Sequence, residues 1–179
     1  MLDINNTALV LIDAQGKLAH LMHDAQPLIK GLQTMVQAAK LLDIPVLWAE
    51  QLPHKLGATI PELARFLEGD RAIHKSCFSC AANSDFQDIL QHSGRQQLLV
   101  IGIEAHICVM QSVLAFLSQG YEVHLISDAI GARFPHNKIA AIARCEKAGA
   151  IISTCEMALF ELMREADHPQ FKAVQGLIK

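Results

Sequence analysis

The sequence predicts an α/β protein, a three-layer α/β/α fold on a six-stranded parallel sheet with the Rossmann-like strand order 3-2-1-4-5-6. Short apolar runs alternate with helical patterns along all 179 residues. The runs are almost continuously apolar, which is typical of strands covered by helices on both faces. No linker, repeat or low-complexity segment interrupts this alternation, so we expect a single domain over residues 1–179.

The expected strands are runs rich in leucine, valine and isoleucine, and turn residues or helical patterns separate them. The second run is entered through Pro45. In chain order the predicted strands are Ala8–Ile12, Val46–Ala49, Arg71–His74, Gln97–Ile101, Glu122–Ile126 and Ala150–Ser153.

The expected helices lie between these strands. The helix after the first strand has apolar residues at helical spacing, and Pro61 suits the first turn of the next helix. Gly94 and Gly120 each end a later helix. The predicted helices are Leu28–Leu42, Pro61–Leu67, Ser84–His92, Ile107–Ser118, Lys138–Ala148 and Met157–Arg164, with a last turn or two near Gln170–Ile178.

The predicted strand order makes the first and fourth strands neighbours, and ligands of open α/β sheets bind at the carboxyl ends of such a pair. Asp13 follows the first strand and Cys108 lies just beyond the fourth. Lys75 ends the third. We therefore expect an acid, an amine and a thiol at one edge of the sheet.

Cys108 is the expected nucleophile. The segment Gln97–Val109 is typical of a buried strand, a glycine turn at Gly102 and a helix that opens at or just before the cysteine. Free N–H groups at a helix start favour a thiolate over a thiol, and they stabilise the oxyanion that forms when a carbonyl is attacked. The alternative is a buried structural thiol.

Asp13 and Lys75 suit the same chemistry. A carboxylate after four apolar residues is partly desolvated, so its pKa rises toward the range of a general base. An ammonium nearby stabilises both the carboxylate and a thiolate. The alternatives are an aspartate that caps the next segment and a solvated surface lysine.

These residues resemble the motifs of the isochorismatase-like cysteine hydrolases. The resemblance rests on D-x-Q at Asp13 and Gln15, on Lys75 after the third strand, and on the glycine-to-cysteine segment Gly102–Val109. It extends over nearly the whole chain, and residues 56–63 and 168–172 are most similar to the isochorismatase domain-containing subgroup.

The resemblance implies a Cys-Asp-Lys triad of Cys108, Asp13 and Lys75, and a cis peptide bond between Ile103 and Glu104. It also implies an oxyanion hole made by the backbone N–H groups of Glu104 and Cys108. The implied reaction is hydrolysis of a small amide or related C–N bond through a thioester.

The sequence departs from parts of the family in ways that narrow this activity. The stretch after the second strand has no D-x-H metal motif, so we expect neither a metal nor another cofactor, and nicotinamide is disfavoured. True isochorismatases lack the cysteine, so Cys108 argues against isochorismate.

The expected substrate pocket draws on side chains near strand ends and on loops. For Trp48 the alternative is packing in the core. For His106 the alternative is a position on a surface loop without a role in binding. The predicted substrate-binding residues are Gln15, Trp48, Leu52, Phe78, His106 and Phe134.

Composition limits the partners. The net charge is −3 with no basic stripe, which argues against nucleic acid, and no signal sequence or membrane-spanning run is present. The odd number of cysteines, five, favours free thiols. We expect a cytoplasmic homo-oligomer that acts on a small molecule. Two alternatives stay open: a non-catalytic binding protein, or a redox-responsive thiol protein that uses Cys77 and Cys80.

Overall fold

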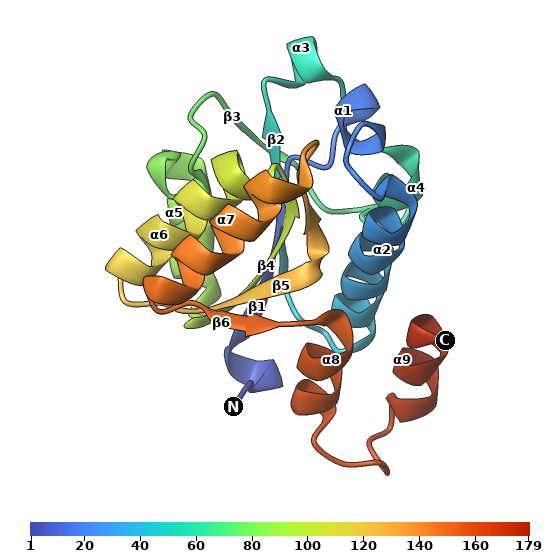
Figure 1. Ribbon diagram of the computed structural model, residues 1–179. Helices are drawn as coiled ribbons and strands as arrows, with labels where there is room; N and C mark the ends of the chain where they lie inside the picture. Colours follow the sequence, from blue (N-terminus) through green and yellow to red (C-terminus); the bar gives the residue numbers. More distant parts are fainter.

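The computed structural model describes residues 1–179 and contains one six-stranded sheet (Figure 1). All strand pairs are parallel and the order is β3-β2-β1-β4-β5-β6, so the predicted fold class and order are confirmed. The strands are β1 (Thr7–Ile12), β2 (Val46–Gln51), β3 (Ile73–Lys75), β4 (Gln97–Ile103), β5 (Glu122–Gly131) and β6 (Ile151–Ser153).

Helices cover both faces of the sheet. Figure 1 shows α2, α8 and α9 on one side and α5, α6 and α7 on the other. The helices are α1 (Gly16–His20), α2 (Ala25–Leu41), α3 (Pro53–Leu56), α4 (Pro61–Ala64), α5 (Ser84–Ser93), α6 (Met110–Ser118), α7 (Pro135–Lys147), α8 (Cys155–Met163) and α9 (Phe171–Ile178).

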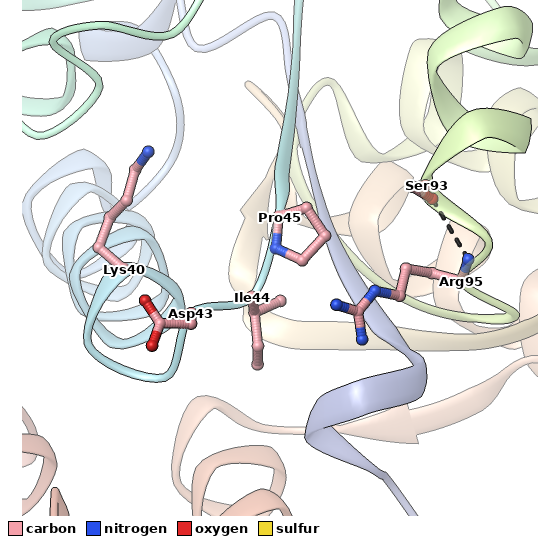
Figure 2. Close-up of a pocket in the computed structure, with 6 residues that line it drawn as sticks. All are labelled: Lys40, Asp43, Ile44, Pro45, Ser93 and Arg95. Atoms are coloured by element: carbon pink, nitrogen blue, oxygen red, sulfur yellow. Dashed lines mark hydrogen bonds between the residues drawn. The ribbon is translucent and has the colours of Figure 1, made fainter.

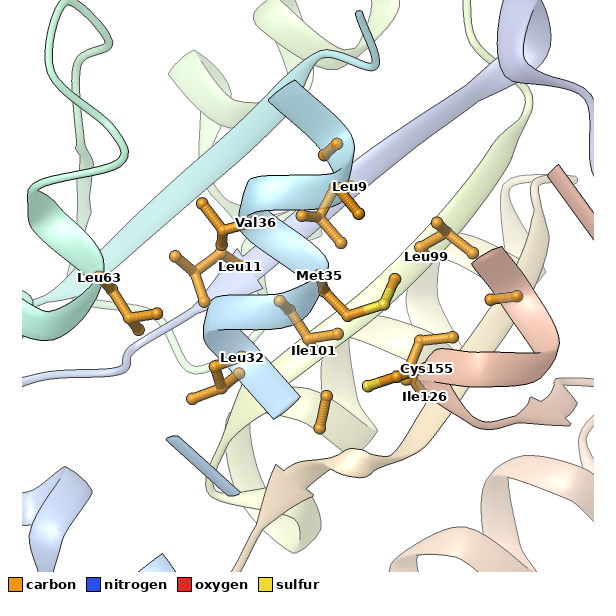
Figure 3. Close-up of a cluster of buried hydrophobic side chains, with 14 of the residues drawn as sticks. Leu9, Leu11, Leu32, Met35, Val36, Leu63, Leu99, Ile101, Ile126 and Cys155 are labelled. Atoms are coloured by element: carbon orange, nitrogen blue, oxygen red, sulfur yellow. The ribbon is translucent and has the colours of Figure 1, made fainter. Parts of the chain in front are cut away.

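Two apolar cores result, one on each face, because successive strand residues point to opposite sides. Leu9 and Leu11 pack toward α2, where Figure 3 shows them facing Met35 and Val36. Val10 packs on the other face with the side chains of α5 and α6. All these strand residues are fully buried, and β1 is apolar from Ala8 to Ile12.

The largest difference from the predicted elements lies around the fourth and fifth strands. The helix expected over Ile107–Ser118 starts as a wide π-type turn, Ala105–Val109, before α6 begins at Met110. Strand β5 runs on to Gly131, and its register against β4 shifts between Val100 and Gly102. Two short helices, α1 and α3, were not predicted because their few residues carry no helical period.

Gly102 allows β1 and β4 to approach closely where the strands end. It pairs with Ile12, and its φ of 122° lies in the region that side chains rarely adopt. A Cβ at this position would overlap the backbone of Ile12. The close approach brings the residues after the two strands, Asp13 and Glu104, to one edge of the sheet.

No helix is long enough and apolar enough to cross a membrane.

Candidate active site

Asp13 leaves β1 at the carboxyl edge of the sheet, and its carboxylate is buried. Its backbone N–H still donates to Ala49 O (3.1 Å), but its φ of 50° turns the chain away from the strand direction. Oδ2 accepts a hydrogen bond from Lys75 Nζ at 2.8 Å, while Oδ1 is buried without a well-aligned donor. The side chain caps no helix: α1 begins after Gln15 without a side-chain cap.

Lys75 is the last residue of β3, and its side chain is completely buried rather than solvated. Besides Asp13, the ammonium donates to Gln51 Oε1 (2.7 Å), Phe78 O (3.1 Å) and Cys77 O (3.3 Å). One carboxylate and three neutral oxygens therefore surround it. Asp13 and Lys75 form a buried, hydrogen-bonded ion pair, the arrangement in which two buried charges are tolerated.

Cys108 lies in the π-type turn beside this pair. It is 7% exposed and belongs to the apolar core on the α5 and α6 face. Burial acts on the pKa of the Cys108 thiol, and so do the charges of Asp13 and Lys75, so this ion pair lies close enough to influence the sulfur. The structure thus joins Lys75 to Asp13, and the role of Cys108 as the third member of the site stays a prediction.

The surroundings of Cys108 oppose ionisation of its thiol. Burial raises the pKa of the Cys108 thiol, and the negative charge of Asp13 raises it further, while Lys75 only partly offsets them. Desolvation and the neighbouring carboxylate therefore oppose the stabilisation of a thiolate that free N–H groups at a helix start favour. A thiol whose pKa is raised in this way reacts with the help of a base that takes its proton.

The two charged groups are both shifted upward. Burial raises the pKa of Asp13, which fits a base, although Lys75 opposes the shift. Burial alone would lower the pKa of Lys75, but attraction to Asp13, Cys80 and Cys108 raises it above its usual 10.5. The ammonium therefore stays charged at neutral pH.

Glu104 starts the segment that carries Cys108, and the Ile103–Glu104 peptide bond is cis, as the resemblance implies. The Glu104 N–H donates to no other group of the chain. The side chain is buried and forms an ion pair with Arg133 Nε at 3.1 Å, and the Arg133 N–H donates to it at 3.2 Å. A free backbone donor thus lies four residues before the cysteine.

Leu52 and Phe78 contact Lys75 through their backbones, and their substrate role stays a prediction. The Leu52 N–H donates to Lys75 O (3.0 Å), and the Phe78 ring is 53% exposed while its carbonyl holds the ammonium. A cavity of about 360 Å³ opens here, lined by Leu52, Pro53, His54, His74 and Lys75.

The structure contradicts two of the expected substrate contacts. Gln15 is fully buried, and its amide is bonded to the backbone of Gln51 and Gly57. Trp48 packs with the core on the α2 face, away from Cys108, and its Nε1 donates to Thr59 Oγ1 (2.7 Å). Both side chains are structural: the amide of Gln15 is fully hydrogen-bonded, and Trp48 lies on the other face of the sheet from Cys108.

His106 and Phe134 face α7. His106 Nε2 contacts Asn137 Nδ2 at 3.3 Å, so the imidazole is engaged outside the Asp13–Lys75 pair. The Phe134 ring is 54% exposed and stacks on His136, with the ring centres 5.8 Å apart. Neither contact links these side chains to the ion pair, and their substrate role stays a prediction.

Sequence reasoning missed Gln51, the last residue of β2, which holds Lys75 directly. The available signal was its place: a polar residue that ends the strand next to β1. No three His, Cys, Asp or Glu side chains lie close enough together to hold a metal ion.

Another cavity, of about 400 Å³, lies at the opposite edge of the sheet (Figure 2). Figure 2 shows it between the end of α2, the entry to β2 at Pro45, and the end of α5, where Ser93 is followed by the loop that carries Arg95. Its charged residues are on the surface, and none belongs to the candidate site.

Comparisons with known proteins identify the family of this chain. The family model described as the isochorismatase domain matches residues 7–157. Isochorismatase domain-containing protein 2 of Homo sapiens is 36% identical over 174 residues, which cover 97% of this chain and 83% of the human protein.

Two solved structures have the same fold. MAR1 ribonuclease from Caenorhabditis elegans superposes with a TM-score of 0.93 at 35% identity, covering 99% of this chain and 91% of that one. YcaC from Pseudomonas aeruginosa, solved with hexane-2,5-diol and covalent acrylamide, has a TM-score of 0.92 at 26% identity, covering 98% and 90%. By family model and by relatives alike, the chain belongs to the isochorismatase family.

Proposed function

We propose that this protein is a cysteine hydrolase that cleaves a small amide or related C–N bond through Cys108, Asp13 and Lys75. The observation that carries the proposal is the Lys75–Asp13 ion pair, joined at 2.8 Å and buried beside a cysteine at the carboxyl edge of the sheet. A buried charge pair next to a nucleophilic side chain is typical of active sites.

The first half of the reaction forms a thioester. Asp13 takes the proton of the Cys108 thiol as the sulfur forms a bond to the carbonyl carbon of the substrate. The electron pair of the C=O bond moves to oxygen, and the N–H groups of Glu104 and Cys108 are the expected donors to that oxyanion. The oxyanion then reforms the carbonyl, the C–N bond breaks, and Asp13 returns the proton to the leaving amine or ammonia.

The second half releases the acid. Asp13, again a carboxylate, takes a proton from water as the water oxygen attacks the thioester carbon. The C–S bond breaks, the carboxylic acid leaves, and the sulfur recovers its proton from Asp13. Lys75 stays charged throughout and stabilises whichever neighbour is negative, the carboxylate or the thiolate.

A reactive thiol is supported by one relative. The P. aeruginosa structure carries covalent acrylamide, and acrylamide is an electrophile that alkylates thiols. The C. elegans relative is named a ribonuclease. This chain has a net charge of −3 and no free cation at the site, which argues against a polyanionic substrate here.

Two expectations accompany the proposal. A cytoplasmic location is one of them. A homo-oligomer is the other, and exposed apolar side chains such as Phe78, Phe134 and Ile139 support it. Light scattering after gel filtration tests the oligomer directly.

The experiment is turnover of a panel of small carboxamides, read as released ammonia or amine, together with intact mass of the quenched enzyme. The proposal predicts turnover by the wild type, an acyl adduct on Cys108, and loss of both in Cys108→Ser. Turnover that survives this substitution contradicts the mechanism. RNA cleavage that depends on Cys108, without turnover of any amide, would replace the proposed substrate class.

The same samples separate the two alternatives from sequence. A redox protein predicts a Cys77–Cys80 disulfide after mild oxidation, whereas all five cysteines are free in the structure. A binding protein predicts no adduct and no turnover with any amide.

A further inference from the structure

Gln51 connects the candidate site to the end of β2. Its side chain is 6% exposed, and its two amide atoms have different partners. Nε2 donates to Ser76 O at 2.7 Å, and Oε1 accepts from Lys75 Nζ at 2.7 Å. Because the carbonyl of Ser76 needs a donor, the orientation of the amide is fixed, with its oxygen on the ammonium.

Gln15 fixes the backbone of Gln51 in turn. Its Oε1 accepts from the Gln51 N–H (2.7 Å), and its Nε2 donates to Gln51 O (3.2 Å) and Gly57 O (2.6 Å). Gln15 lies two residues after Asp13. A closed loop of contacts therefore runs from Asp13 through Gln15, Gln51 and Lys75 back to Asp13.

The neutral charge of the Gln51 side chain is as important as its position beside the Lys75 ammonium. The Lys75 ammonium is surrounded by the Asp13 carboxylate, two peptide carbonyls and this amide oxygen. A glutamate would reach the same distance but would add a second negative charge. It would also face Ser76 O without a donor.

We propose that Gln51 is a positioning residue of this site, whose neutral amide holds the Lys75 ammonium against Asp13 and leaves its charge free to stabilise the Cys108 thiolate. The inference rests on the proposed function. When the proton passes from Cys108 to Asp13, the thiolate becomes the only negative neighbour of the ammonium. A second carboxylate at position 51 would compete for that ammonium and disfavour proton transfer.

The test is the pH dependence of Cys108 alkylation by iodoacetamide, followed by mass spectrometry, in wild type, Gln51→Glu and Gln51→Met. Gln91→Glu, a substitution on the exposed face of α5, adds the same charge away from the site. We expect the midpoint of Gln51→Glu to move upward by about one pH unit or more, because like charges disfavour each other. Gln91→Glu keeps the wild-type midpoint.

Gln51→Met separates positioning from charge. It removes the hydrogen bond without adding a charge, so we expect a slower reaction, by about tenfold at each pH, with the midpoint unchanged. If Gln51→Glu does not fold, Gln51→Met decides: a rate at the wild-type level overturns the inference. A folded Gln51→Glu with the wild-type midpoint also overturns it.

The outcomes distinguish this inference from the proposed function. If Cys108 reacts no faster in the wild type than in Asp13→Asn, the proposed function fails. The role of Gln51 then fails with it. If the reaction depends on Asp13 but the variants at position 51 behave as wild type, only the role of Gln51 is lost.

Discussion

Cys108 and Cys155 occupy similar local settings with different surroundings. Each follows a strand, lies where a helix begins, is 7% exposed and has an aspartate nearby. Burial raises the pKa of both thiols, and the neighbouring aspartate adds to the rise. A buried cysteine with an acid at a helix start is therefore not by itself a reactive site.

The surroundings of the two cysteines differ in the buried cation beside Cys108 and in the position of the aspartate. Asp13 is 3% exposed and paired with Lys75, whereas Asp128 is exposed, and its Oδ1 accepts the Cys155 N–H at 2.8 Å. Lys75 lowers the pKa of Cys108, whereas the rise of the Cys155 pKa comes from burial and from Asp128. The Cys155 thiol donates instead to Gly31 O at 3.7 Å. The comparison indicates that Lys75 separates a candidate nucleophile from a packing cysteine.

The largest effect is expected from exchanging each sulfur for oxygen. Cys108→Ser should lower amide turnover by at least about a thousandfold, because the nucleophile is lost. Cys155→Ser should stay within about twofold of wild type. Steady-state kinetics on one amide substrate measure both. Equal losses in the two variants would break the comparison.

Removing the cation tests stability. Lys75→Met leaves the Asp13 carboxylate buried without its partner, so we expect a loss of about 3–5 kcal/mol in the free energy of unfolding. Lys40→Met is the matched control, since its ion pair with Asp70 is about one-third exposed and should cost less than about 1 kcal/mol. Urea unfolding of both variants gives the comparison, and similar losses would mean that the buried pair has no special role.

The two aspartates sharpen the comparison further. Asp13→Asn removes the base, so alkylation of Cys108 should slow by about a hundredfold. Asp128→Asn should leave the alkylation of Cys108 unchanged and should not slow that of Cys155, because Asp128 raises the pKa of the Cys155 thiol. Labelling rates read by peptide mass spectrometry test this. A Cys108 rate insensitive to Asp13→Asn would mean that Asp13 is not the base.

The smallest effect is expected in the free energy of unfolding at alkaline pH. The pKa of Lys75 is raised above 10.5 in the folded protein. The stability that this shift contributes is complete below 10.5 and is lost as the pH rises through the folded value. The stability advantage of wild type over Lys75→Met should therefore shrink above pH 10.5, by about 1.4 kcal/mol for each unit of the shift at most. An advantage that grows in this range would give the shift the opposite sign.

Much of the fold and the location of the site could be predicted, because both follow from periodicity and topology. Apolar runs between helical patterns predict a doubly covered parallel sheet, and its strand order brings the residues after β1, β3 and β4 together. Asp13, Lys75 and Cys108 are then neighbours before any contact is known.

The contacts themselves could not be predicted. The helix start before Cys108 is visible in the sequence, but the burial that raises the pKa of its thiol is not. The sequence does not show on which face of the sheet Trp48 lies. That face is known only when the alternation of side chains along β2 has been placed relative to the two cores. Gln15 and Gln51 are recognised as partners only when their amides lie within hydrogen-bond distance.

The most direct test of the central claim is the labelling rate of each of the five cysteines by iodoacetamide in the folded protein at neutral pH. If Asp13 and Lys75 activate Cys108, it reacts at least about tenfold faster than the equally buried Cys155, and this advantage disappears in Asp13→Asn. If Cys108 and Cys155 react at the same slow rate, and the more exposed Cys77 reacts first, the ion pair does not activate the thiol and the account is contradicted.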